Sequence, residues 1–212
     1  MRHDPRWLCV LALLASAPAH ALTWGPTAAA GVVITPAQPR DEVTIQPLIG
    51  PVAQVGLQTG RVTTNQIMLQ VSYAGGGVDY DTQPLDGHVS LRTLALGDEL
   101  RWDIFGKKGK AHLSPQLGFG FLAGTVHVEA SASSDDEDVQ SALEVQNLTD
   151  QSTDSFYLEF HAMAGLRYRV SKNLGVHVET GLSTYGGFLG TWMPKIGVDY
   201  LIPKAGQKAQ KK

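Results

Sequence analysis

Cysteine is almost absent from this chain of 212 residues, and its one cysteine is Cys9. An internal disulfide framework and a thiolate metal site are therefore excluded. Basic residues are not in excess, since 17 Lys and Arg stand against 20 Asp and Glu, so no nucleic-acid partner is expected. The chain also lacks an apolar run of the roughly 20 residues that a spanning helix needs. A hydrophobic content of 43% with 23 glycines remains compatible with a barrel, whose wall alternates apolar and polar residues.

The first 21 residues have the three parts of an export signal. Arg2 and Arg6 give a positive start, residues 7–15 form an apolar run, and Ala19-His20-Ala21 supplies a small-x-small cleavage pattern. The run is too short to span a membrane as a helix. We therefore expect residues 1–21 to be a cleaved signal peptide.

Period-two alternation dominates the rest of the chain and is clearest over residues 156–170. One face of this segment is wholly apolar, from Phe156 to Val170, and the other carries Glu159, His161, Arg167 and Arg169. A run of 15 residues is long for a soluble strand, where about 5–6 is usual. It suits a tilted membrane strand that extends beyond the bilayer.

Further strands are predicted from the same alternation. They lie within residues 43–58, 66–73, 88–105, 112–129, 176–185 and 192–202. Pro47 and Pro51 predict an interruption in the first of these, and an apolar phase change near Thr93 predicts a bulge or two shorter strands. Since a bacterial single-chain barrel has an even number of strands, an eighth is expected at residues 28–36.

The connections between these strands alternate in length, as in a membrane barrel. Short turns are expected at residues 60–63, 106–110 and 171–174, and longer loops at residues 75–87, 131–155 and 186–191.

The last strand carries a family resemblance. Lys195, Gly197, Tyr200 and Ile202 fall in the order polar, glycine, aromatic and hydrophobic, which resembles the C-terminal assembly signal of bacterial outer-membrane barrels. Residues 115–120 and 164–169 are similar to inner strands of the small OmpA/OmpX/opacity-like barrels. In that family the signal ends in a terminal Phe, whereas here Ile202 is followed by ten more residues.

The resemblance implies an all-β fold, an antiparallel up-and-down transmembrane β-barrel of about eight strands in the outer membrane. It further implies that outer-membrane lipid and lipopolysaccharide surround the barrel and that the barrel-assembly machinery inserts it. The expected organisation is a signal peptide at 1–21, an N-terminal segment with the first strand at 22–42, the barrel at 43–202, and a basic, disordered tail at 203–212.

If the apolar faces meet lipid, the charged faces fill the lumen. The expected interior ion network comprises Glu159, His161, Arg167, Arg169, His177, Glu179, Lys195 and Asp199, together with Glu99 and Arg101. Both signs occur on neighbouring strands, and an eight-stranded lumen is only wide enough for side chains, so mutual pairing is expected. Two alternatives remain open: a selectivity or proton pathway, and a metal or acid–base site at His161, His177 and Glu179.

Residues 131–155 contain seven acidic residues and no Lys or Arg, which predicts a solvated surface loop. Asp135, Asp136, Glu137 and Asp138 are candidate ligands for a divalent cation shared with lipid phosphates. The D-x-D-x-D-G spacing of a calcium loop is absent.

No motif of catalysis is present. Gly-x-Ser-x-Gly, HExxH and phosphate-loop patterns are lacking. The His-x-Ser pair of barrels resembling the lipid A deacylase is not provided by His177-Val178-Glu179, and His88-Val89-Ser90 lacks the following Asn.

We therefore interpret the chain as a non-enzymatic outer-membrane barrel without a cofactor, structural or interacting through its extracellular loops. One alternative is a lipid-active enzyme or a narrow conduit for small hydrophobic molecules. Another is a soluble periplasmic lipocalin-like barrel, whose apolar faces would point inward.

Overall fold

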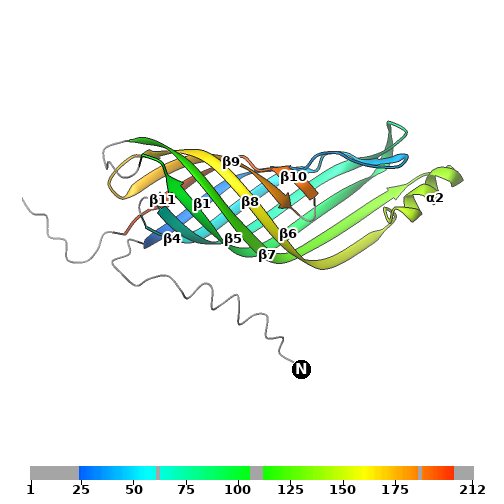
Figure 1. Cartoon of the computed structure of the whole chain (residues 1–212). Helices are drawn as coiled ribbons and strands as arrows, with labels where there is room; N and C mark the ends of the chain where they lie inside the picture. The colour runs from blue at the N-terminus through cyan, green and yellow to red at the C-terminus, as the bar shows by residue number, and fades with distance from the viewer. Residues whose placement is uncertain (1–23, 61–62, 106–111, 186–187, 203–212) are drawn as a thin grey trace, which may run out of the picture.

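The strands close into one antiparallel ring of eight positions (Figure 1). The computed structural model describes residues 24–60, 63–105, 112–185 and 188–202. The ring strands are β1 (Trp24–Ile34), β4 (Ile49–Thr59), β5 (Thr63–Tyr80), β6 (Gln83–Asp103), β7 (Leu113–Ser133), β8 (Gln151–Arg169) and β9 (Leu174–Tyr185), with the eighth position shared by β10 (Phe188–Trp192) and β11 (Lys195–Tyr200). The expected up-and-down barrel is confirmed.

Strand β1 closes the ring because it pairs on both edges. Ala28 lies opposite Val55 of β4 on one side and opposite Val198 of β11 on the other. A strand edge left open in hydrocarbon would expose unpaired N–H and C=O groups, so closure is what allows strands to span a bilayer. The strand predicted at residues 28–36 is thus confirmed, and it begins four residues earlier, at Trp24. The predicted signal peptide and basic tail lie outside the described residues.

The outward face of the wall is predominantly apolar. Leu158, Leu166 and Val178 are 47%, 44% and 48% exposed, while Glu159 and Arg167 between them are buried. A soluble ligand-binding barrel has the opposite arrangement. The lipocalin-like alternative is therefore wrong, and the apolar belt faces acyl chains.

Aromatic side chains mark both rims of the belt, as in membrane barrels generally. The rim at the short-turn end carries Trp24, Trp102, Tyr168 and Tyr200, and the opposite rim carries Tyr73, Phe156 and Trp192. Trp102 also packs against Phe119, with ring centroids 5.3 Å apart. Because short turns face the periplasm in this class, the rim with Tyr73 and Trp192 is the extracellular one.

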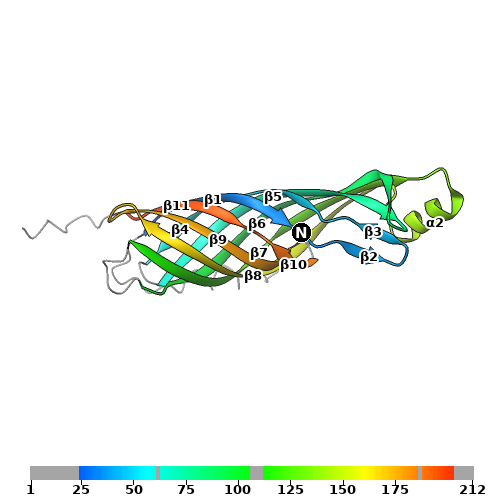
Figure 2. The same ribbon diagram turned by 90° about the horizontal axis from the view of Figure 1, so that it is seen from above.

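Beyond the extracellular rim the chain builds a cap, which we define as residues 35–48, 75–92 and 127–155. It contains the extended ends of β5–β8, the hairpin of β2 (Gln38–Arg40) and β3 (Val43–Ile45), and the helix α2 (Glu137–Val145). Figures 1 and 2 show all of them at one end of the barrel. β3 pairs with the end of β5, Val43 opposite Tyr80, so the hairpin continues the wall sheet.

The long loop expected at residues 75–87 is wrong. β5 and β6 continue to a two-residue turn at Asp81 and Thr82, whose φ angles are 46° and 68°. Positive φ at both positions is the mark of a type I′ turn, whose twist matches that of the two strands. The three consecutive glycines at 75–77 suggested a loop, but here they lie inside β5.

The solvated loop expected at residues 131–155 is also wrong, because α2 lies within it. Asp136 caps the helix by accepting from the amides of Asp138 and Val139. Val139 and Leu143, four residues apart, are buried against the cap and hold the helix down. Within the described residues, no helix has the length and hydropathy to cross a membrane.

The bulge or break expected near Thr93 is wrong, since β6 pairs with β7 without a register shift. Val89 and Leu91 point inward and Leu94 points outward, so both phases are apolar because the upper interior is itself apolar. The interruption expected from the prolines is confirmed, as residues 46–48 separate β3 from β4.

Ala162 tests the orientation of the wall, since it faces lipid near the middle of β8. Replacing it with Arg should lower the free energy of unfolding by about 2–4 kcal/mol, whereas Val170→Arg at the periplasmic rim should lower it by only about 0–1 kcal/mol. Urea unfolding in lipid vesicles measures both. Equal losses at the two positions would contradict the membrane depth assigned here.

Candidate functional site

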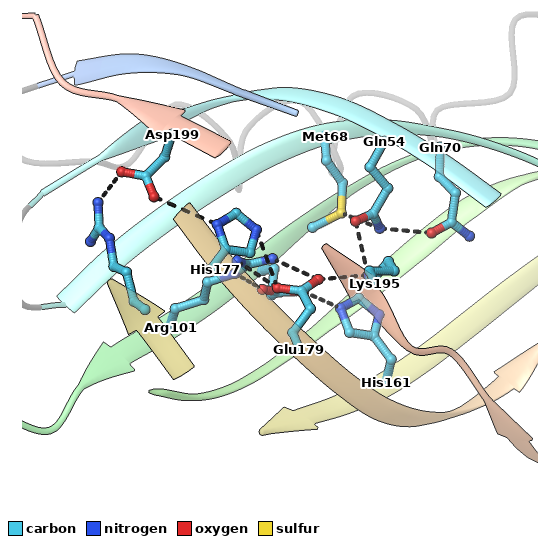
Figure 3. A network of polar contacts seen from close by, with 11 residues as sticks. Gln54, Met68, Gln70, Arg101, His161, His177, Glu179, Lys195 and Asp199 are labelled. Carbon is cyan, nitrogen blue, oxygen red and sulfur yellow. Dashed lines mark hydrogen bonds and ion pairs between the residues drawn. The ribbon is translucent and has the colours of Figure 1, made fainter. Parts of the chain in front are cut away.

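The periplasmic half of the lumen is filled by a polar network centred on Arg101 (Figure 3). Its guanidinium lies between two carboxylates: Nε donates to Glu99, and Nη1 lies 2.8 Å from Glu179. All three side chains are at most 4% exposed. Two buried carboxylates of the same sign are tolerated here because the forked cation of Arg101 pairs with both, and Lys195 adds a second positive charge beside Glu179.

Lys195 extends this network across the lumen to the opposite wall. Its Nζ lies 3.0 Å from Glu179 and donates to Gln54 Oε1 at 2.8 Å. Gln54 in turn donates to Gln70 at 2.7 Å. The contacts therefore tie β11 and β9 to β4 and β5 through side chains alone.

Two histidines complete the network, each facing a glycine. His161 Nε2 lies 2.8 Å from Glu99. The ring nitrogens of His177 lie 3.6 Å from Glu179 and 3.6 Å from Asp199. Glycine is required opposite both rings: a Cβ on Gly197 would come within 2.4 Å of His177, and one on Gly120 within 2.9 Å of His161.

The predicted interior residues all point into the lumen, and most of them pair. Arg167 pairs with Asp199, and Arg169 with Asp103 at 2.9 Å. Glu159 is the exception, since it is fully buried and neither of its carboxylate oxygens has a hydrogen-bond partner among the described residues. Asp103, Gln54 and Gln70 also belong to the network, and their inward phase was readable from the alternation of the sequence.

Above this network the interior changes character and becomes apolar. Leu48, Leu91 and Leu122 are fully buried there. They belong to one cluster, the cap core, that continues from the upper lumen into the cap: Val33, Val43, Ile45, Leu48, Met68, Ala74, Val78, Val89, Leu91, Ala95, Leu122, Val126, Ala130, Ala132, Val139, Leu143, Leu148, Tyr157 and Met193. The polar half of the lumen is therefore covered by packed side chains on the extracellular side.

The cap surface is strongly acidic and carries a cleft. The three cap segments contain 13 Asp and Glu and only two Arg. A cleft of about 280 Å³ separates the β2–β3 hairpin from α2. Across it Arg40 donates to the Gln146 carbonyl at 3.5 Å and Gln146 donates to Asp41 at 3.4 Å, and Val145 is left 78% exposed at the edge.

The candidate cation ligands Asp135, Asp136, Glu137 and Asp138 lie at the start of α2. The carboxylate of Asp136 is used as the helix cap, and acidic residues in the first turn favour the helix dipole. Among the described residues, no group of three or more His, Cys, Asp or Glu is placed to hold a metal ion. The helix accounts for these residues without a cation, and the same finding leaves the metal alternative at His161, His177 and Glu179 without support.

A row of charges crosses β6, β7 and β8 just above the belt. His127 lies 2.8 Å from Asp154 and 3.4 Å from Glu129, and Arg92 lies 2.9 Å from Glu129. The hydrogen bond to Asp154, followed by that to Glu129, raises the pKa of His127. At the tip of the cap, a 2.7 Å hydrogen bond to Glu42 raises the pKa of Tyr80 to about 12.

The residues of the predicted assembly signal occupy different environments. Lys195 and Gly197 face the lumen, Tyr200 lies on the periplasmic rim, and β11 ends there, before Ile202. Recognition by assembly machinery stays a prediction.

Asp98 is a charged residue of the lipid-facing surface that was not among the predicted site residues. It occupies the outward phase of β6, where Leu94, Leu96, Leu100 and Trp102 are apolar. A charged side chain on the lipid face costs up to about 2–4 kcal/mol for Arg or Lys at the bilayer midplane, and less for Asp. The gap in the apolar alternation at this position was the available signal.

The comparisons agree with this architecture. Neisserial surface protein A matches with a TM-score of 0.50 and 11% identity, over 86% of this chain and 100% of that one. This is the fold of the small outer-membrane β-barrels. OprG from Pseudomonas aeruginosa (TM-score 0.46, 10% identity, 86% of this chain and 95% of that one) and Ail of Yersinia pestis (0.42, 13%, 85% and 99%) match less well. No family model and no curated protein matches the sequence.

With its apolar belt and two aromatic rims, this small outer-membrane barrel spans the outer membrane, as the resemblance of its last strand implied.

Arg101 and Arg92 form a matched test of the network, because each pairs with carboxylates but only Arg101 is buried. Arg101→Met leaves Glu179 with Lys195 and Glu99 with His161 but removes the guanidinium that both buried carboxylates share, and it should lower the free energy of unfolding by about 3–5 kcal/mol. Arg92→Met breaks an exposed pair and should cost about 1 kcal/mol or less. Urea midpoints in vesicles measure the difference, and similar losses would show that the network is not a structural element.

His127 gives a test by pH. Because its pKa is raised in the folded state, its pairing should stabilise the cap fully below the unfolded pKa and lose that effect as pH rises through the folded value. NMR titration in nanodiscs should find the His127 pKa above its ordinary value, and Asp154→Asn should bring it down. An unchanged pKa in Asp154→Asn would contradict the assigned cause.

Proposed function

We propose that this barrel is a non-enzymatic surface protein whose cap binds a basic partner outside the cell. The observation that carries the proposal is that the cap is a folded platform and not a set of loops. β5 to β8 are 18 to 21 residues long, well beyond what the belt needs. A barrel that only filled the membrane would not need such a platform.

Rigidity of the cap supports binding at its surface. The cap core continues without a break from the lumen to α2, through Leu122, Val126 and Leu143. Hydrogen bonds join the pieces at the top, as between Tyr80 and Glu42. A surface held in one arrangement loses little conformational entropy when a partner binds.

The charge of the cap supports a basic partner. With 13 carboxylates against two Arg, the cap presents a negative field, and such a field steers cations and cationic proteins toward the surface. The cleft beside α2 combines carboxylates of Asp41 and Glu42 with the exposed Val145, which suits a chain of mixed basic and aliphatic side chains.

The packing of the interior favours this function over the conduit. A conduit needs a continuous path, whereas Leu48, Leu91 and Leu122 pack across the upper lumen. We propose as well that lipopolysaccharide and phospholipid are surroundings of the belt and not substrates, and that the barrel-assembly machinery inserts the chain.

The platform is tested with barrels in nanodiscs and a Lys- and Leu-containing peptide as the probe, with a Glu-containing peptide of equal length as control. Binding of the basic probe should weaken about tenfold in the variant D135N/D136N/E137Q/D138N and should fall with added salt. Asn at 136 keeps the helix cap, so the variant changes charge and not fold. Binding no stronger than that of empty nanodiscs would reject the proposal.

Two further measurements separate the alternatives. Conductance steps in a planar bilayer would favour the conduit. A changed mass spectrum of lipid A in cells with and without the gene would favour the enzyme. We expect neither.

A further inference from the structure

Asp98 lies within a row of apolar side chains that faces lipid across five strands. The registers place it between Ile67 of β5 and Phe121 of β7, and the row continues to Leu57 and Phe160. Along β6 its outward neighbours are Leu96 and Leu100. The carboxyl group is thus surrounded by hydrocarbon side chains on all four sides within the wall.

The depth of Asp98 keeps it away from water and headgroups. It is the third of the six outward positions from Leu94 to Ile104, which together span the belt on β6. Trp102, on the periplasmic side, already marks the rim. Phospholipid headgroups lie beyond that rim, so they do not reach the carboxyl group.

Hydrogen bonding of Asp98 is incomplete. Asn65 Nδ2 on β5 donates to Oδ2 at 3.3 Å, whereas Oδ1 is buried in the wall and has no hydrogen-bond partner among the described residues. A carboxylate accepts about four hydrogen bonds, and the Asn65 amide has a second N–H to give. Oδ2, which already accepts from Asn65, has a second lone pair that can accept a further hydrogen bond.

We propose that the β5–β6 face is the interface of a homodimer in the membrane, in which Asp98 and Asn65 of one protomer hydrogen-bond to Asn65 and Asp98 of its partner. A free donor beside a free acceptor is self-complementary under a two-fold axis, because each copy offers what the other lacks. The neutral acid fits equally, since its O–H then donates to the amide oxygen of the partner's Asn65.

A second copy fits this face better than other occupants. In lipid, helices and barrels are joined by van der Waals packing and by polar side chains that find partners across the interface. The outward neighbours of the pair, Leu69, Leu96 and Ile67, are 42%, 51% and 40% exposed and supply the packing surface. Ionisable groups inside the bilayer are rare and require a partner within the membrane.

The test is crosslinking in native outer membranes, in a Cys9→Ser background that leaves no other thiol. Leu69→Cys places a reporter on the β5–β6 face, and Val178→Cys places a matched reporter on β9, away from it. A short bis-maleimide should link two copies through Leu69→Cys and not through Val178→Cys.

The polar pair is then varied within the Leu69→Cys protein. Asp98→Leu and Asn65→Leu should each weaken dimerisation roughly tenfold, measured by sedimentation equilibrium in density-matched micelles, whereas Asp98→Asn should retain it. Heat-modifiable gel mobility checks that each variant is folded, and Asp98→Leu should unfold at higher urea because it removes a polar group from the belt.

Three outcomes would overturn the dimer: a wild-type chain that is monomeric and not crosslinked, crosslinking that is equal in Asp98→Leu, or a crosslink from Leu69→Cys to a different protein. None of them bears on the cap, since binding of the basic probe is measured on single barrels in nanodiscs.

Discussion

Pairing of every backbone N–H and C=O within the wall is the constraint on which the rest of this structure depends. In hydrocarbon there is no water to replace a missing partner, so the sheet must close, and β1 achieves this by pairing with β4 and β11. Closure fixes the register, and the register fixes which side chains meet lipid and which meet each other. The contacts of Arg101 with Glu179 and of Lys195 with Gln54 follow from that geometry.

The lumen inside the closed wall has two halves, which are held together by different interactions. In the periplasmic half, strands are joined across the lumen by charges, and glycines such as Gly120 and Gly197 make room for the rings that they face. In the extracellular half, strands are joined by the cap core, which resembles the core of a soluble protein. The charged half joins the strands within the membrane, and the apolar half allows the wall to extend above the membrane as a folded surface.

Most of the wall was predictable from the sequence. The two-residue period of Phe156–Val170, with one apolar and one charged face, is the pattern of a strand whose two faces meet different surroundings. The cap was not predictable in this way. Its strands carry apolar or small side chains on the inside, as at Val89 and Leu91, and polar side chains on the outside, which is the opposite of the wall. Three consecutive glycines also suggested a loop. The charged residues of the lumen were predictable as a set. Their individual pairs were not, because partners such as Arg101 and Glu179 are 78 residues apart and meet only through the ring.

Ring closure by the first and last strands also constrains how the chain reaches this state. One edge of β1 pairs with β4, which follows it closely in the sequence. The other edge pairs with β11, which is the last strand of the wall along the chain. Contacts between such distant parts of a chain form slowly. Until they form, two edges of the sheet stay open, and hydrocarbon offers their N–H and C=O groups no substitute partner.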